Sequence, residues 1–304
     1  MMPQGEPAKD RTRTIAVTGA TGAVGGRVAA RLSAAGATLR LVVRDPSRAP
    51  RLPGADVVAV PGGYADGAGL RTALTGVDTL YLVSAAEAED RLQQHLTAVE
   101  AAAAGVRRIV YTSFVGADRP EPTFTLVRHH SATEEAIRAT GVRHTILRHS
   151  MYADFVPFFA VTEGDRAVIA APAGEGRTGF VSRDDLADVG TAVLLRDDHE
   201  LDGEALEVTG PEALTLAEAA AVLAEVTGRP AEYRRQTESQ AWETRRPSGH
   251  PDWEIEGWVS SYLAIAAGEL ATVTDVVLRL TGHPARTVAE QLRAHPDDWA
   301  HLRG

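Results

Sequence analysis

Three glycines follow one another at intervals of three residues, Gly19, Gly22 and Gly25, directly after the apolar run Thr14–Thr18. At this spacing the first glycine permits a tight turn, the second leaves no side chain where a pyrophosphate approaches, and the third lets the next helix pack closely on the strand. The first turn of that helix offers free N–H groups and a positive dipole end to phosphate oxygens. A glycine-rich turn without a ligand would share the pattern. We expect a dinucleotide to bind along Gly19, Ala20, Thr21, Gly22, Ala23, Val24 and Gly25.

The end of the second apolar run, Thr38–Val43, is where the two nicotinamide dinucleotides are distinguished. An acidic residue there accepts hydrogen bonds from the ribose 2′-hydroxyl of NAD, but here the run ends in Arg44. A guanidinium can pair with the 2′-phosphate of NADPH, whereas the alternative is a solvated surface arginine. Asp45, one residue later, either reaches a ribose hydroxyl or caps a turn. We therefore expect NADPH as cofactor, with NADH possible.

The elements that must position this loop alternate along the first half of the chain. The apolar runs have the continuous pattern of strands buried on both faces. Helical patterns lie between them, at Gly22–Ala35, Ala68–Leu74, Ala88–Ala104 and Arg128–Thr140. The order predicts an α/β fold with a doubly wound parallel sheet of the Rossmann type. Its strands are expected at Thr14–Thr18, Thr38–Val43, Asp56–Val60, Thr79–Val83, Arg108–Thr112 and His144–Leu147.

The regular alternation fades after about residue 150. We interpret residues 12–150 as the dinucleotide-binding domain and residues 151–304 as a smaller α/β substrate lobe, which need not fold alone because its elements can cross back to the first sheet. Residues 1–11 are polar and aperiodic, which is typical of a disordered tail.

Composition narrows the function classes. The formal net charge of −10 argues against a nucleic-acid partner. The chain has no cysteine, which excludes disulfides, thiolate metal sites and a cysteine nucleophile. No apolar run reaches membrane-spanning length and no signal peptide is evident, so we expect a cytoplasmic protein without a membrane partner.

With these residues in view, the chain resembles the NmrA-like, or atypical, short-chain dehydrogenase/reductase family, and within it the NAD(P)H-dependent quinone and dye reductases. The resemblance implies an oxidoreductase that transfers hydride from NADPH to a quinone or another flat, electron-poor conjugated substrate. It rests on the motifs Val17–Gly25, Tyr111–Ser113, Thr145–Arg148, Ser182–Asp188 and Thr281–Thr287.

The Tyr-x-x-x-Lys pair of the wider superfamily is missing. Counting back from Thr145, the resemblance gives the lysine position to His130 and the tyrosine position to Leu126. Reducing an ordinary ketone makes an alkoxide that needs a proton donor at once, whereas a quinone gives a delocalised anion that can wait for solvent. Without the usual acid, the site favours an electron-poor conjugated acceptor, which is reduced mainly through proximity and orientation.

Three polar residues are the catalytic candidates: His130, Ser113 and Tyr152. His130 would hold the cofactor ribose or donate a proton near neutral pH, although a histidine with a structural partner is as plausible. Ser113 ends the fifth strand, where ligands approach a parallel sheet, and otherwise caps a turn. Ser84 ends the fourth strand and is expected to touch the cofactor by the same logic.

The substrate is expected to meet an apolar wall after the sixth strand, formed by Met151, Tyr152 and Phe155, unless these side chains serve only in packing. The late tryptophans either cover a flat substrate or pack the smaller lobe. We expect no metal site, because the adjacent His129 and His130 diverge on a helix.

Two functions of different class remain. The first is the reductase, acting on a small aromatic or quinone-like molecule, either as a monomer or as a homodimer. The second is a non-catalytic NAD(P)-binding redox sensor of the NmrA type, which would bind cofactor without consuming it. An epimerase or dehydratase is disfavoured, because such enzymes use the missing tyrosine.

Overall fold

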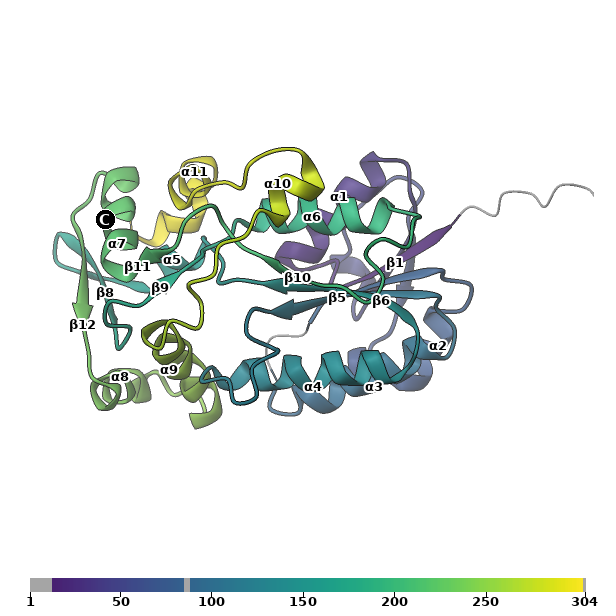
Figure 1. The fold of residues 1–304 in the computed structure, drawn as a ribbon, viewed down its shortest axis with the longest axis horizontal. Coiled ribbons are helices and arrows are strands. Elements are labelled where there is room, and N and C mark those ends of the chain that lie inside the picture. Colours follow the sequence, from purple (N-terminus) through teal and green to yellow (C-terminus); the bar gives the residue numbers. More distant parts are fainter. Residues whose placement is uncertain (1–12, 85–87, 303–304) are drawn as a thin grey trace, which may run out of the picture.

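The computed structural model describes residues 13–84 and 88–302 (Figure 1). The tail predicted over residues 1–11 lies outside these residues. Within the described part of the chain, no helix combines the length and the apolar character needed to cross a membrane.

A seven-stranded parallel sheet forms the centre of the molecule, in the order β10-β6-β5-β4-β1-β2-β3. Its inner strands are rich in Val, Ile and Leu and are largely buried on both faces, as a sheet between two helical layers requires. The predicted doubly wound parallel sheet is confirmed. The strands are β1 (Thr14–Thr18), β2 (Thr38–Val43), β3 (Asp56–Ala59), β4 (Thr79–Leu82), β5 (Arg108–Phe114), β6 (Arg143–His149) and β10 (Ala205–Val208).

Helices cover both faces of this sheet (Figure 1). On one face lie α1 (Ala23–Ala34), α6 (Arg183–Leu195) and α10 (Val276–Thr281), and on the other lie α2 (Gly67–Ala73), α3 (Arg91–Ala103) and α4 (Thr125–Ala139). Each layer has its own apolar core against the sheet. The carboxyl ends of the strands are thereby left as the edge where a ligand can approach.

The later part of the chain contributes to both lobes. Strand β10 pairs with β6 in parallel, and α6 packs on α1, so residues 183–208 return to the first sheet. The division into two domains at residue 150 therefore stays a prediction. In the structure, elements from the later half of the chain join the sheet formed by the first half.

The second lobe packs around a separate core beside the first sheet (Figure 1). Its strands are β7 (Ala160–Glu163), β8 (Arg166–Ala171) and β12 (Ala231–Arg235) in one sheet, and β9 (Arg177–Thr178) with β11 (Leu214–Thr215) in another. Its helices are α5 (Phe155–Phe158), α7 (Leu216–Thr227), α8 (Glu238–Arg245), α9 (Asp252–Ala266) and α11 (Val288–Ala294).

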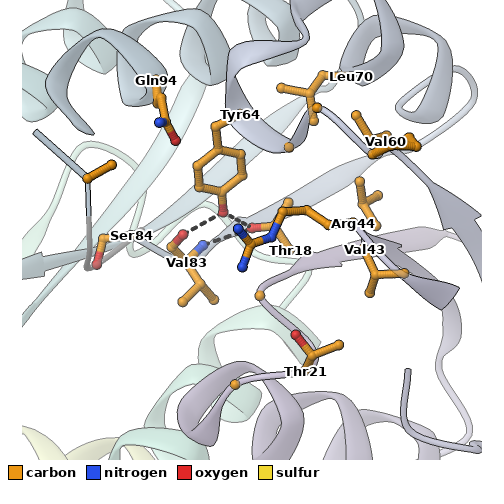
Figure 2. Close-up of a pocket in the computed structure, with 17 residues that line it drawn as sticks. Thr18, Thr21, Val43, Arg44, Val60, Tyr64, Leu70, Val83, Ser84 and Gln94 are labelled. Atoms are coloured by element: carbon orange, nitrogen blue, oxygen red, sulfur yellow. Dashed lines mark hydrogen bonds between the residues drawn. The ribbon is translucent and has the colours of Figure 1, made fainter. Parts of the chain in front are cut away.

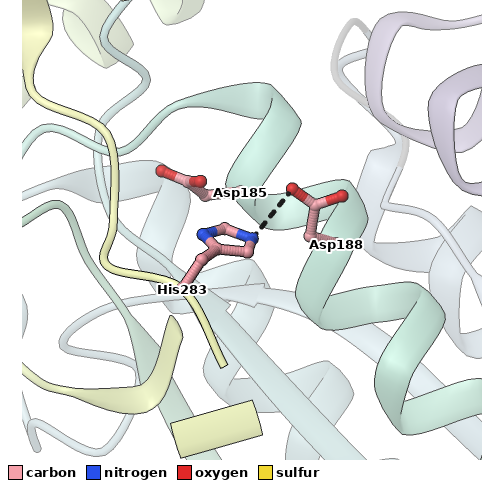
Figure 3. Close-up of side chains that lie close together, drawn as sticks. All are labelled: Asp185, Asp188 and His283. Atoms are coloured by element: carbon pink, nitrogen blue, oxygen red, sulfur yellow. Dashed lines mark ion pairs between the residues drawn. The ribbon is translucent and has the colours of Figure 1, made fainter. Parts of the chain in front are cut away.

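A charged cluster ties the C-terminal segment to α6 (Figure 3). Asp185, Asp188 and His283 bring potential ligand atoms within 4.8 Å of one another. Arginines already engage both carboxylates: the backbone N–H of Arg286 donates to Asp185 at 2.7 Å, and Nε of Arg31 donates to Asp188 at 2.7 Å. The guanidinium of Arg286 also pairs with both aspartates. The cluster is accounted for by ion pairing between α1, α6 and the segment after α10.

Candidate functional site

The glycine loop between β1 and α1 has the backbone that its spacing predicts. Gly19 has φ 63°, a left-handed conformation that glycine adopts without strain. A Cβ atom on Gly25 would overlap the carbonyl oxygen of Gly19, so only glycine lets the helix start this close to the turn. Gly22 is the N-cap of α1 and supplies no side-chain cap. The first turn of α1 therefore has no side-chain acceptor from its N-cap, which suits an anionic ligand.

A cavity of about 520 Å³ opens above this loop (Figure 2). Thr18, Gly19, Thr21 and Gly22 line one side, and Arg44 at the end of β2 lines another. A volume of this size is typical of small-molecule and cofactor sites. The glycine loop and the uncapped start of α1 fit the pyrophosphate of a dinucleotide, and the guanidinium of Arg44 fits a second phosphate on its ribose.

Arg44 and Asp45 have separate roles in the structure. The Asp45 carboxylate accepts hydrogen bonds from the backbone N–H of Ser47 at 2.9 Å and from its hydroxyl at 2.7 Å, which caps a short 3₁₀ helix (Pro46–Arg48). These hydrogen bonds hold the pKa of Asp45 below its ordinary value. Of the two alternatives for Asp45, the structure has the turn cap. Arg44 is exposed and faces the cavity (Figure 2).

Sequence reasoning missed two polar residues of the cavity, Tyr64 and Gln94. Tyr64 lies in a 3₁₀ turn (Gly63–Ala65), and its hydroxyl donates to the Val83 carbonyl at 2.5 Å and lies 2.6 Å from Thr18 Oγ1 (Figure 2). Burial raises the pKa of this phenol well above its ordinary value, so it stays protonated. Neither residue belongs to a motif, and the turn that carries Tyr64 has no periodic pattern. The predicted Ser84 does line the cavity.

His130 lies on α4 and is held by a buried tyrosine. Its Nδ1 atom is 2.9 Å from the Tyr111 hydroxyl on β5, and the Tyr111 side chain is fully buried. Burial, together with the nearby His95 and Arg91, holds the pKa of His130 well below its ordinary value. The imidazole is therefore neutral at physiological pH and acts through hydrogen bonds instead of charge.

Ser113 lies in a buried network on the α4 side of the sheet. Its hydroxyl donates to Glu134 Oε1 at 2.6 Å, and Arg148 donates to the same carboxylate at 2.9 and 2.8 Å. Burial raises the pKa of Glu134, but the hydrogen bonds from Arg148 and Ser113 outweigh this effect and hold the pKa below its ordinary value. The structure thus places Ser113 with a carboxylate of the core, and it is not among the residues that line the large cavity.

Of the three side chains expected to form the substrate wall, Tyr152 and Phe155 lie together, and Met151 packs elsewhere. The rings of Tyr152 and Phe155 lie 5.3 Å apart, and the Arg183 guanidinium is 4.9 Å from the centre of the Tyr152 ring. Burial raises the pKa of Tyr152 to about 12. Met151 is 5% exposed and packs in the core of the second lobe, so its side chain serves packing in this structure.

A second cavity, of about 190 Å³, adjoins the first, because Ala88 lines both. Leu126, to which the resemblance gives the tyrosine position of the wider superfamily, lines it with His129 and Trp253. Trp242 and Trp258 instead pack around the small core of α8 and α9. Of these three tryptophans, Trp253 therefore faces a cavity, and Trp242 and Trp258 pack the second lobe.

A family model for the NmrA-like family matches residues 11–247. The chain belongs to the NmrA-like family. The family and the Rossmann-type fold predicted from the sequence are thereby confirmed.

Relatives from this group match along nearly the whole chain. The (4-alkanoyl-5-oxo-2,5-dihydrofuran-3-yl)methyl phosphate reductase of Streptomyces griseus subsp. griseus is 35% identical over 286 residues, 94% of this chain and 99% of that protein. Quinone oxidoreductase 2 of Escherichia coli K12 is 31% identical over 281 residues, 91% of this chain and 97% of that protein. The crystal structure of the NADPH-dependent quinone oxidoreductase of Escherichia coli complexed with NADPH has a TM-score of 0.82 at 29% identity, covering 95% of this chain and 100% of that one.

Proposed function

We propose that this member of the NmrA-like family is an NADPH-dependent reductase of quinones and similarly flat, electron-poor conjugated molecules. The observation that carries the proposal is the cavity that runs from the glycine loop to Arg44 and adjoins a second cavity lined by Leu126, where the superfamily has its acid. Full-length relatives that are named reductases favour an enzyme over a sensor.

The residues of the large cavity fit NADPH. The backbone of Gly19–Gly25 would hold the pyrophosphate, and Arg44 would pair with the 2′-phosphate. Bound NADPH supplies a hydride, which with one proton from water converts a quinone to its hydroquinone. Ser84 and the half-buried Tyr64 line the part of the cavity wall that the bound cofactor would face.

The chain's own side chains act on the acceptor through orientation and hydrogen bonding. Neutral His130, fixed by Tyr111, is proposed to donate a hydrogen bond to cofactor ribose or acceptor. Tyr152 keeps its proton at physiological pH, since its pKa is about 12, and with Phe155 it forms an aromatic wall. The catalytic role of Ser113 stays a prediction; its hydrogen bond to Glu134 favours a positioning role instead.

The sensor remains the second candidate, because Leu126 and His130 stand in place of the catalytic pair. A homodimer stays a prediction, and with a net charge of −10 we expect no nucleic-acid partner.

The test is consumption of NADPH, and separately of NADH, by the purified protein with a panel of small quinones and an alkanoyl-substituted 5-oxo-2,5-dihydrofuran. We expect turnover that saturates in both substrates and is faster with NADPH. Tight NADPH binding without turnover on any acceptor would replace the reductase with the sensor.

A further inference from the structure

His149, the last residue of β6, is a buried histidine to which the proposed function gives no role. Its side chain is 1% exposed, and neither ring nitrogen has a hydrogen-bond partner within residues 13–84 and 88–302. A neutral imidazole carries one donor and one acceptor, and leaving both unpaired in a protein interior is costly and rare. The arrangement indicates that a partner for His149 comes from a bound molecule.

The position of β6 favours the acceptor over the cofactor as that molecule. Counting along the sheet, β4, β5 and β6 follow β1, so the end of β6 is roughly 14 Å from the glycine loop at the usual strand spacing. The pyrophosphate belongs at β1, which leaves the edge beyond β5 for the molecule that receives the hydride. His149 also lies beside the proposed aromatic wall, with its ring centre 6.2 Å from that of Tyr152.

We propose that His149 binds the carbonyl oxygen of the conjugated acceptor through a ring N–H. The inference rests on the proposed function. Burial lowers the pKa of His149 to about 3, so the imidazole is neutral and donates a hydrogen bond without giving up a proton. As the hydride reaches the acceptor, negative charge develops on this oxygen, and a fixed donor stabilises it until water supplies the proton. Because the imidazole is 1% exposed, the side chains that cover it must move to admit the acceptor.

Two substitutions separate hydrogen bonding from packing. His149→Leu removes both unpaired nitrogens, and His149→Asn keeps an N–H donor. We expect His149→Leu to lower kcat/KM for a naphthoquinone roughly 10²-fold, with the Kd for NADPH unchanged and the melting temperature of the ligand-free protein unchanged or higher. His149→Asn should recover part of the lost activity. Thr178→Val is the matched control, because Thr178 Oγ1 is also buried without a partner in the described structure; its kcat/KM should equal that of the wild type.

The other outcomes overturn the inference. A His149→Leu protein that turns over like the wild type would show that the acceptor does not use this donor. Unfolding or a lowered melting temperature in His149→Leu would show that the nitrogens have structural partners. An equal loss of kcat/KM in His149→Leu and His149→Asn would show that the effect comes from the shape of the side chain and not from its N–H donor. If the wild type itself reduces no acceptor, the proposed function fails, independently of His149.

Discussion

At the scale of single residues, we propose that Arg44 sets the cofactor preference. Its side chain faces the cavity, and Asp45 is occupied as a cap, so the guanidinium is the group available for a 2′-phosphate. Replacing it with aspartate removes a charge-assisted hydrogen bond and adds repulsion. We expect Arg44→Asp to lower kcat/KM for NADPH about 10- to 100-fold, with little change for NADH.

Arg48→Asp is the matched control for this substitution, since Arg48 is exposed and is not among the residues that line the cavity. Its NADPH to NADH ratio should stay near that of the wild type. If the ratio of kcat/KM for NADPH to that for NADH is the same in the wild type and in Arg44→Asp, Arg44 does not determine cofactor preference.

The buried Glu134–Arg148 pair governs stability at the same scale. Glu134→Gln leaves the buried Arg148 with the exposed Asp118, 2.9 Å away, as its ionic partner in the described structure. The substitution should therefore lower the free energy of unfolding by about 3 kcal/mol at pH 7, measured with urea. The pKa of Glu134 is lower in the folded protein, so its contribution is fully present above about pH 4.5 and is lost as pH falls. The difference in free energy of unfolding between the wild type and Glu134→Gln should therefore become smaller in acid. A difference that does not change with pH would contradict a stabilising role for the Glu134 carboxylate.

Ser113→Ala separates the two roles considered for that serine. If its hydroxyl serves Glu134, the variant loses about 1 kcal/mol of stability and keeps its kcat. A large fall in kcat with unchanged stability would restore the catalytic role predicted from the sequence.

At the scale of elements, the close contact between β1 and α1 forms the proposed phosphate site. Alanine is favoured over glycine inside a helix by about 1 kcal/mol, so Gly25→Ala would stabilise an isolated α1. In the folded protein its Cβ would overlap the Gly19 carbonyl, and we expect a weakened Kd for NADPH and a lowered melting temperature. Gly105→Ala, where a Cβ meets open space, is the control. Normal NADPH binding by Gly25→Ala would contradict the close approach.

Elements with a clear repeat were predictable, and irregular turns were not. The spacing of Gly19, Gly22 and Gly25 specifies a backbone conformation, so the loop and its helix could be placed from the sequence. Tyr64 reaches the cavity from a short turn, and Gln94 lies on a helix whose facing side depends on packing. Ser113 was expected at the ligand edge, but the alternation of side chains along β5 directs it to Glu134.

At the scale of the whole molecule, the two halves of the chain share the central sheet. Because β10 and α6 come from the later half of the chain, we expect one cooperative thermal transition in calorimetry. NADPH at 100 times its Kd should stabilise this single unit by about 2.7 kcal/mol. Two transitions, with only one moved by NADPH, would show that the lobes unfold separately.

The overall class was also predictable, since alternating strands and helices permit few topologies. The return of β10 to β6 could not be located from the sequence, because a four-residue strand carries little pattern and each of its residues pairs with a residue of β6 that lies 59 positions earlier in the chain.

Hydride transfer to a conjugated acceptor without a tyrosine acid is tested most directly by a single turnover. The protein is loaded with NADPH deuterated at the transferred position and mixed with a naphthoquinone or with a simple aliphatic ketone. We predict oxidation of one equivalent of NADPH by the quinone with a primary isotope effect, and no oxidation by the ketone. Bound NADPH that persists with both acceptors, or a ketone reduced as fast as the quinone, would contradict this account.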